Sequence, residues 1–309
     1  CFGLRVPTCV PTDERITSRS RSPLGKPANV DAGTLSNPGF LELYSQTRGF
    51  SLGMPGIVGV LPNGQGVLFL RATDAKSFVK DLWMFDVAAG KERVLLTAQQ
   101  VLEGKKEELT PEELARRERM RESGRGIVSV SVSKDGKTLL VPLSGRLFAI
   151  DISDLTKPTV REVKAAAGAP PAEVPTLSRD GKLIGVVRKG ALYVNDVVSG
   201  IETRVSPEAT EGVEYGLAEF VAQEEMDRRA GFWFSPDGSM IVFQKTDSSK
   251  VEQLTIVDPS KPGAAAQSWP YPRAGQTNAE VTLSIASTKG GPTKPITWDR
   301  DAYPYLARV

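Results

Sequence analysis

The sequence predicts an all-β protein organised as a β-propeller, and two observations carry this prediction. A turn dipeptide, Asn-Gly or Asp-Gly, recurs four times, and each copy precedes two short apolar runs of strand length. The glycines of these turns, Gly64, Gly136, Gly181 and Gly238, follow one another at intervals of 72, 45 and 57 residues. An interval near 45 residues is typical of one four-stranded propeller blade. A stack of β-hairpins that does not close into a propeller is the alternative.

Each repeat unit is expected to contain a tight turn, a buried strand, a second strand and a polar stop. Asn-Gly and Asp-Gly suit the turn because a tight hairpin needs positive φ angles, which glycine adopts without strain. The apolar runs that follow have the length of buried strands. The strands are expected in pairs at residues 67–70 and 82–86, 139–141 and 147–151, 184–187 and 192–196, and 241–243 and 254–258.

Two of the three intervals exceed one blade, so two blades are expected to carry insertions. The first insertion, residues 98–125, is rich in acidic and basic side chains in equal numbers. Thr110 can cap a helix there, the proline after it suits the first helical turn, and Glu113 completes a capping box. The sequence therefore predicts a short inserted helix that runs to about Arg121. The second insertion covers roughly residues 205–229.

The two ends of the chain differ from the repeats. Residues 1–54 are rich in Ser, Pro, Gly and Thr, and we interpret them as an irregular N-terminal arm before a propeller at residues 55–309. A strand is expected at 281–285, and residues 305–309 have the pattern of the opening of another strand. A chain that stopped there would leave a sheet edge unpaired. We therefore expect that the natural protein continues and that this propeller is partial.

Composition excludes several classes of function. The chain has no histidine, so it contains neither a Ser-His-Asp nor a Cys-His catalytic set, nor a histidine-ligated metal site. A formal net charge of +2 provides no strong basic field for nucleic acid. No apolar run is long enough for a transmembrane helix. No Cys-x-x-Cys pair is present, and neither a metal nor a cofactor is expected. Cys1 and Cys9 allow three interpretations: a disulfide, a lipid-bearing Cys1, or two unpaired thiols.

Three motifs are candidates for chemistry. Residues 49–53 match Gly-x-Ser-x-Gly, but the Met-Pro-Gly that follows stops any helix and no histidine can take the serine proton, so no catalytic role is assigned. Glu224 and Glu225 are either a solvated face or a site for an ammonium group, because two carboxylates accept several charge-assisted hydrogen bonds. The arginine-rich run 116–121 is either a surface helix or the source of a guanidinium for a substrate carbonyl or carboxylate.

Three ordered motifs resemble segments of the dipeptidyl peptidase IV family. Residues 218–228, Ala-Glu-Phe-Val-Ala-Gln-Glu-Glu-Met-Asp-Arg, resemble its glutamate motif, which here continues to Gly-Phe-Trp. Residues 271–278, Tyr-Pro-Arg-Ala-Gly-Gln-Thr-Asn, resemble its Tyr-Pro-Lys-x-Gly-x-x-Asn segment. Residues 112–121 resemble the arginine helix of the branch with bacterial and cytosolic eukaryotic members. The sequence departs from the family where His-Thr is usual, at Arg229-Ala230, and where Trp is usual, at Phe234.

The resemblance, which covers about residues 55–309, implies an eight-bladed propeller packed against a C-terminal α/β-hydrolase domain. Such enzymes are serine exopeptidases that remove N-terminal X-Pro or X-Ala dipeptides. The resemblance implies that Glu224 and Glu225 bind the free N-terminal ammonium of the peptide. It also implies that an arginine of the helix contacts the backbone carbonyl of the substrate, with Arg121 expected first and then Arg117 or Arg119.

The expected function is therefore substrate selection by the propeller region of a dipeptidyl peptidase IV-like enzyme. The hydrolase domain and its catalytic triad are expected beyond residue 309, so this chain alone should not hydrolyse peptides. The alternative is a non-catalytic propeller that binds peptides or is of the TolB-like type. Expected partners are a peptide with a free N-terminus, the hydrolase domain and a second copy in a homodimer, but not nucleic acid. A periplasmic or secreted location is favoured over a cytoplasmic one.

Overall fold

A computed structural model describes residues 39–309 except 110–113, 115–116, 118–121, 258, 261–262 and 264. Most of the expected N-terminal arm, including both cysteines, lies outside the described residues. The chain divides into two compact units, residues 1–45 and 46–309. Helix α1 (Phe40–Gln46) falls at the division between them. Among the described residues, no helix is long and apolar enough to cross a membrane.

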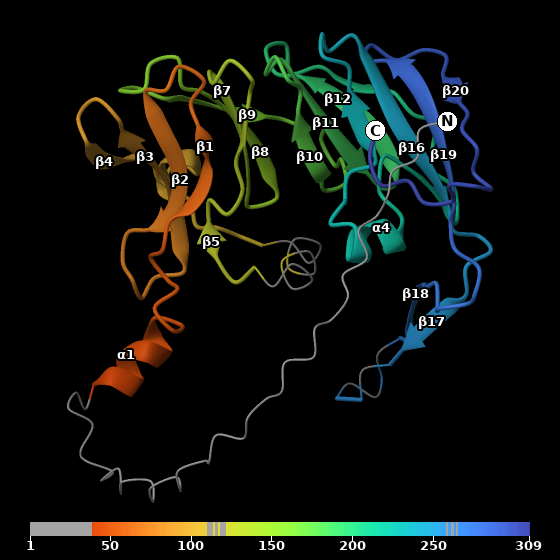
Figure 1. Ribbon diagram of the computed structural model, residues 1–309, viewed down its shortest axis with the longest axis horizontal. Helices are drawn as coiled ribbons and strands as arrows, with labels where there is room; N and C mark the ends of the chain where they lie inside the picture. The colour runs from red at the N-terminus through yellow and green to blue at the C-terminus, as the bar shows by residue number, and fades with distance from the viewer. Residues whose placement is uncertain are drawn as a thin grey trace, which may run out of the picture. The chain divides into compact units, whose positions relative to one another are not determined.

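Within residues 46–309, the described strands form a two-stranded hairpin and four larger, mainly antiparallel sheets, which confirms the predicted all-β class (Figure 1). The four larger sheets follow one another along the chain, and we call them blades 1 to 4. Blade 1 also holds β5 (Arg125–Gly126), which pairs with β3 in parallel. The strands are β1 (Gly56–Val60), β2 (Gly66–Ala72), β3 (Val79–Asp86) and β4 (Lys91–Leu96) in blade 1; β6 (Ser131–Val132), β7 (Thr138–Leu143), β8 (Arg146–Asp151) and β9 (Thr159–Val163) in blade 2; β10 (Glu173–Leu177), β11 (Leu183–Arg188), β12 (Ala191–Asp196) and β13 (Glu202–Arg204) in blade 3; and β14 (Val213–Tyr215), β15 (Phe232–Phe234), β16 (Met240–Asp247), β19 (Glu280–Ser287) and β20 (Lys294–Ile296) in blade 4.

Successive blades pack face to face through apolar side chains. In β7, Leu139 and Val141 lie in the core shared with blade 1, whereas Leu140 between them lies in the core shared with blade 3. Consecutive residues of a strand point to opposite faces, so a strand that is buried on both faces has an unbroken apolar run. Blades 3 and 4 share a third core, which includes Leu192 and Phe243. Each fully buried side chain of this kind stabilises the fold by about 1.5–3 kcal/mol.

The four predicted turns lie at one edge of the blades, which we call the turn edge. Each connects the first strand of its blade to the second. In blade 3 the Ser178 hydroxyl donates to Asp180 Oδ1 at 2.7 Å and accepts from the Leu183 amide at 2.9 Å. Gly181 completes this turn with φ +74°. Blades 2 and 4 repeat the Ser-x-Asp-Gly sequence and the same two bonds, at Ser133 and Ser235. We call the opposite edge, where second strands lead to third strands, the connector edge.

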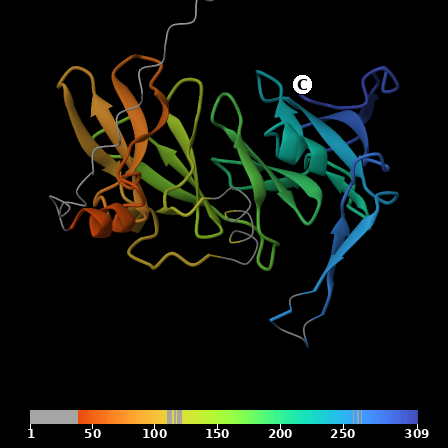
Figure 2. The ribbon, with the colours of Figure 1, turned by 60° about the horizontal axis from the view of Figure 1, so that its bottom comes forward.

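The fourth repeat unit differs from the prediction. The prediction that residues 254–258 form the second strand of this pair is wrong. In the structure, β17 (Gln253–Ile256) pairs instead with β18 (Gln267–Pro270) in a two-stranded hairpin. The true neighbour of β16 is β19, which pairs with it from Met240↔Ser287 to Asp247↔Glu280. Figures 1 and 2 show the hairpin as an arm that extends from blade 4. Periodicity could not reveal this third insertion, because an exposed hairpin strand and a blade strand share the same alternation.

Two expectations for the C-terminal part have opposite outcomes. The strand expected at 281–285 is confirmed as part of β19. Residues 305–309 are described without a strand, so the expected strand opening is wrong. Leu306 is instead buried in a cluster with Val281 and Leu283 of β19, and its carbonyl accepts a hydrogen bond from Arg228.

Candidate functional site

The first strand of blade 4 is split, and the predicted glutamate pair lies on a helix inserted into the split. Both β14 and β15 pair with β16, and between them the chain leaves the sheet to form α4 (Phe220–Glu225). The Gly231 amide donates to the Gly216 carbonyl at 2.9 Å, so the two ends of the excursion meet. Gln244 of β16 bonds to both glycines through its own backbone, at 2.8 and 2.7 Å. The sheet therefore continues across the split while α4 projects from it.

Glu224 and Glu225 are the last two residues of α4, and both are exposed. Within the described part of the chain, neither carboxylate has a hydrogen-bond or ion-pair partner. Adjacent carboxylates repel each other, so a cation that binds between them relieves the repulsion. The pair is thus available to accept charge-assisted hydrogen bonds from an ammonium group.

One residue, Arg228, holds α4 at both ends. A helix of six residues has little stability of its own, so tertiary contacts must place it. Glu219 occupies the N-cap position but makes no capping hydrogen bond. Its carboxylate accepts instead from Arg228 Nη2 at 3.2 Å. At the other end, Asp227 turns the chain with φ +48°, and the Arg228 amide donates to the Ala222 carbonyl at 3.1 Å.

The Glu219–Arg228 pair belongs to a buried polar network. The Gln244 amide group donates to Glu219 Oε2 at 2.7 Å and accepts from Arg228 Nη1 at 2.9 Å. Arg228 Nη2 also donates to the Leu306 carbonyl at 2.7 Å. The Arg228 and Glu219 side chains are only 9% and 6% exposed. Burial lowers the pKa of the Arg228 guanidinium, and the charge of Glu219 opposes that shift. The network joins the segment of α4 to β16 and to the C-terminal segment. Loss of one partner would leave a buried charge unpaired, which is costly.

The first insertion is closed at its base by the predicted residue Arg117. Its guanidinium is buried, where Nη1 donates to the Gly124 carbonyl at 2.8 Å and Nη2 to Glu107 at 3.0 Å. The second oxygen of Glu107 accepts from the Gly126 amide at 2.8 Å, next to the pairing of β5 with β3. Helix α2 (Ala98–Val101) opens the insertion with a capping box formed by Thr97 and Gln100. Of the predicted helix 110–121, Leu114 and Arg117 are described and helical, whereas Arg119 and Arg121 lie outside the described residues.

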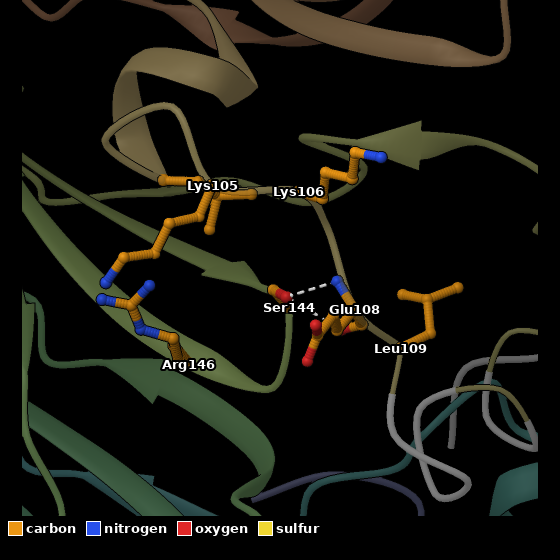
Figure 3. Close-up of a pocket in the computed structure, with 7 residues that line it drawn as sticks. Lys105, Lys106, Glu108, Leu109, Ser144 and Arg146 are labelled. Atoms are coloured by element: carbon orange, nitrogen blue, oxygen red, sulfur yellow. Dashed lines mark hydrogen bonds between the residues drawn. The ribbon is translucent and has the colours of Figure 1, made fainter.

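The β7–β8 turn at the connector edge lies beside both insertions. The Ser144 hydroxyl accepts from the Glu108 amide and donates to the Glu108 carbonyl, each at 2.8 Å (Figure 3). A cavity of about 730 Å³ opens there, between Ser144 and Arg146 of the turn and Lys105 and Lys106 of the first insertion. A second cavity of about 250 Å³ is lined by the same turn and by Arg229, which follows α4 closely. The two insertions predicted to hold substrate therefore adjoin one turn.

The third insertion reaches α4 through an aromatic contact. The ring of Tyr271, the first residue of the motif at 271–278, packs against Phe220 with ring centroids 4.9 Å apart. Asn278, the last residue of that motif, donates from Nδ2 to the Tyr305 hydroxyl at 3.1 Å. The motif thus supports α4 on one side and the C-terminal segment on the other.

Sequence reasoning found the glutamate pair but missed its support. Glu219 and Arg228 flank α4, whereas Gln244 lies in β16, and only the first two belong to the motif that resembled a known family. A polar Gln244 in the middle of the apolar strand β16 was the available signal, because a buried polar residue needs a partner. Ser51 lies in a turn without a following helix, in keeping with the non-catalytic interpretation. Among the described residues, no cluster of acidic or cysteine side chains could hold a metal ion.

Known proteins are similar to this chain over part of its length. The family model described as "Dipeptidyl peptidase IV (DPP IV) N-terminal region" matches residues 133–309. Dipeptidyl peptidase 8 of Mus musculus is 26% identical over 135 residues, which cover 36% of this chain and 15% of that protein. Inactive dipeptidyl peptidase 10 of Rattus norvegicus is 31% identical over 114 residues, which cover 35% of this chain and 14% of that protein.

A solved structure extends the likeness to the fold. The crystal structure of Porphyromonas gingivalis dipeptidyl peptidase 4 superposes with a TM-score of 0.60 at 19% identity, over 84% of this chain and 34% of that chain. The chain thus matches a minor part of the length of each relative. Four consecutive antiparallel blades agree with a partial β-propeller, and the family model spans more than half of the sequence. The chain belongs to the dipeptidyl peptidase IV family, as part of its N-terminal region.

Proposed function

We propose that this chain is the substrate-selecting propeller region of a dipeptidyl peptidase IV-like serine exopeptidase that removes X-Pro or X-Ala dipeptides from peptide N-termini. The observation that carries the proposal is the pair Glu224–Glu225, which is exposed at the end of α4. A third glutamate of the same segment, Glu219, is buried and neutralised by Arg228. The segment thus uses one carboxylate for its own structure and presents two to solvent.

In this proposal the glutamate pair holds the ammonium group of the peptide and so determines which peptide bond is cut. A bound N-terminus places the scissile bond at a constant distance from the pair, and such positioning converts binding energy into rate. The bond itself is cut by a Ser-Asp-His hydrolase domain, which we propose as the partner of this region within the complete protein.

We assign the contact to the substrate carbonyl to Arg121, with Arg119 as the next candidate. Arg117 is the least suitable of the three arginines, because its guanidinium is buried and already holds Glu107 and Gly124. Arg117 then serves to hold the insertion in place. Arg121→Ala in the complete protein should raise KM, whereas Arg117→Ala should also lower the melting temperature.

The test of the glutamate assignment compares Glu224→Gln and Glu225→Gln with Glu211→Gln in the complete protein. Glu211 is an exposed glutamate of the same insertion, outside α4, and is the matched control. Loss of a paired charge at a binding site costs about 2–4 kcal/mol, so kcat/KM for a dipeptidyl anilide should fall about 30- to 1,000-fold for the pair and stay constant for the control. The two pair variants should also discriminate less between a peptide with a free N-terminus and the same peptide after acetylation.

Unchanged kinetics in Glu224→Gln and Glu225→Gln would refute the assignment. Selective binding of free N-termini without hydrolysis would favour the non-catalytic alternative, and one relative of this chain is itself named inactive. The homodimer and the periplasmic or secreted location remain proposals. Light scattering of the purified complete protein tests the first, and fractionation of the native cells tests the second.

A further inference from the structure

We propose that Arg228 is a positioning residue for the glutamate pair, and that the segment around Leu306 provides the other half of its support. This inference rests on the proposed function of Glu224 and Glu225. Arg228 does not touch the amine in this proposal, because its side chain is buried. It acts through α4.

The position of Arg228 in the network is unusual, because it contacts three parts of the chain at once. Its side chain holds the start of α4 through Glu219, and its amide holds the end of α4 through the Ala222 carbonyl. The same guanidinium reaches the Leu306 carbonyl, 78 residues further along the chain. The glutamate pair lies between Ala222 and Arg228 in the chain, in the turn that the Arg228 amide closes, so the orientation of the pair depends on how Arg228 is held.

The Leu306 contact is itself supported by packing on blade 4. Leu306 lies in the apolar cluster with Val281 and Leu283, against which Trp233 also packs. The Arg228 guanidinium lies over the Trp233 ring at 5.7 Å from its centroid. A displacement of the C-terminal segment would therefore remove the carbonyl from Arg228 and loosen the apolar cluster against which Trp233 packs. We infer that amine binding is coupled to the way this segment packs.

Arginine suits this position because of its geometry. A guanidinium presents several N–H donors in one plane, and here they serve Glu219, Gln244 and the Leu306 carbonyl together. A lysine would retain the charge but concentrate it on one nitrogen, so it could not span the same partners. Arg228→Lys should thus keep the charge balance with Glu219 while it loosens the link to Leu306.

The kinetic test uses the complete protein with Arg228→Lys and with the double variant Glu219→Gln/Arg228→Gln. The double variant removes both buried charges together, so its folding does not suffer from an unpaired charge. We expect both proteins to fold, with KM for a dipeptidyl substrate raised about tenfold and kcat changed much less, because ground-state binding is lost. A KM equal to that of the unmodified protein in the double variant would overturn the proposal, because Arg228 would then be only a charge partner.

A second test follows α4 directly in the 309-residue chain, without substrate. The Met226 and Arg228 amides both donate to the Ala222 carbonyl, so their hydrogen exchange reports how firmly the end of α4 is held. Leu306→Ala should speed their exchange about tenfold, while exchange in β7 of blade 2 stays constant. Arg308→Ala, at an exposed position two residues away, is the matched control and should change neither. Equal protection of both amides in Leu306→Ala and the unmodified chain would contradict the coupling.

The two proposals fail in different ways. If Glu225→Gln leaves kcat/KM unchanged while Leu306→Ala still loosens α4, the amine-binding function is wrong and only the mechanical link stands. If Glu225→Gln lowers kcat/KM while the Arg228 variants keep a normal KM, the function stands and the positioning role is wrong.

Discussion

The turn edge and the three insertions belong to the same blades but are built in opposite ways. At the turn edge, blades 2, 3 and 4 repeat one sequence, and each turn is closed by bonds within a few residues, as at Ser178. The three insertions do not repeat one another's sequence. The second and third depend on contacts between distant residues, such as Arg228 with Leu306 and Phe220 with Tyr271. The scaffold is thus specified locally and repeatedly, whereas the candidate site is specified once, by long-range contacts.

The largest expected effect is on the scaffold, where blades 3 and 4 meet. A Cβ atom added at Gly185 would lie 2.4 Å from a ring carbon of Phe232, so Gly185→Ala must displace the ring or the strand. Overpacking of this kind should lower the free energy of unfolding by about 3 kcal/mol, as measured by urea denaturation. Gly59→Ala is the control, because an added Cβ there meets no atom within 4 Å.

If the scaffold and the site are specified separately, variants of the glutamate pair should not change the stability of the fold. Glu225→Gln should leave the free energy of unfolding within about 0.5 kcal/mol of the unmodified chain, because its side chain is exposed. If it destabilised the chain as much as Gly185→Ala, the separation between scaffold and site would break down.

A smaller effect is expected at the repeated turns. Ser133→Ala and Ser178→Ala each remove a buried hydroxyl that donates to an aspartate and accepts from a backbone amide. Each should cost about 1–2 kcal/mol of unfolding free energy. The double variant should depart from the sum, because the two turns are in contact: the Lys134 amide donates to the Arg179 carbonyl at 2.8 Å. Ser153→Ala removes a hydrogen bond to Asp151 at an exposed position and should change the free energy of unfolding by less than about 0.5 kcal/mol. A double variant that shows the plain sum would indicate that the contact between the two turns does not couple them.

The smallest effect is expected on the stability of the fold at acidic pH. Hydrogen bonds from Ser235 and from the amide of Ser239 lower the pKa of Asp237 to about 2. A carboxyl group whose pKa is lower in the folded than in the unfolded state contributes stability above its unfolded value, near pH 4, and loses it as pH falls toward 2. Asp237→Asn should therefore flatten the decline of the urea midpoint between pH 4 and pH 2. An unchanged slope would show that this turn does not titrate with folding.

The same difference between regions explains what could be predicted from the sequence. The strands after Asp135-Gly136 and Asp180-Gly181 could be predicted because turn chemistry and apolar runs are local signals. The hairpin β17–β18 could not, since the partner of a strand is a long-range property that alternation does not encode. The glutamate pair was visible as a motif. Its link to Leu306 was not, because nothing near either residue in the sequence points to the other.

The split strand of blade 4 makes α4 a replaceable module. The chain leaves the sheet at Gly216 and returns at Gly231, where a backbone hydrogen bond joins the two ends. A loop whose ends already meet carries little closure cost for changes in its length or content. A different binding segment could therefore be grafted between these glycines while the ladder with β16 stays intact, if it also supplies partners for the buried Gln244 side chain and the Leu306 carbonyl. Specificity could then diversify at this blade through changes to the segment and to the few residues that contact it.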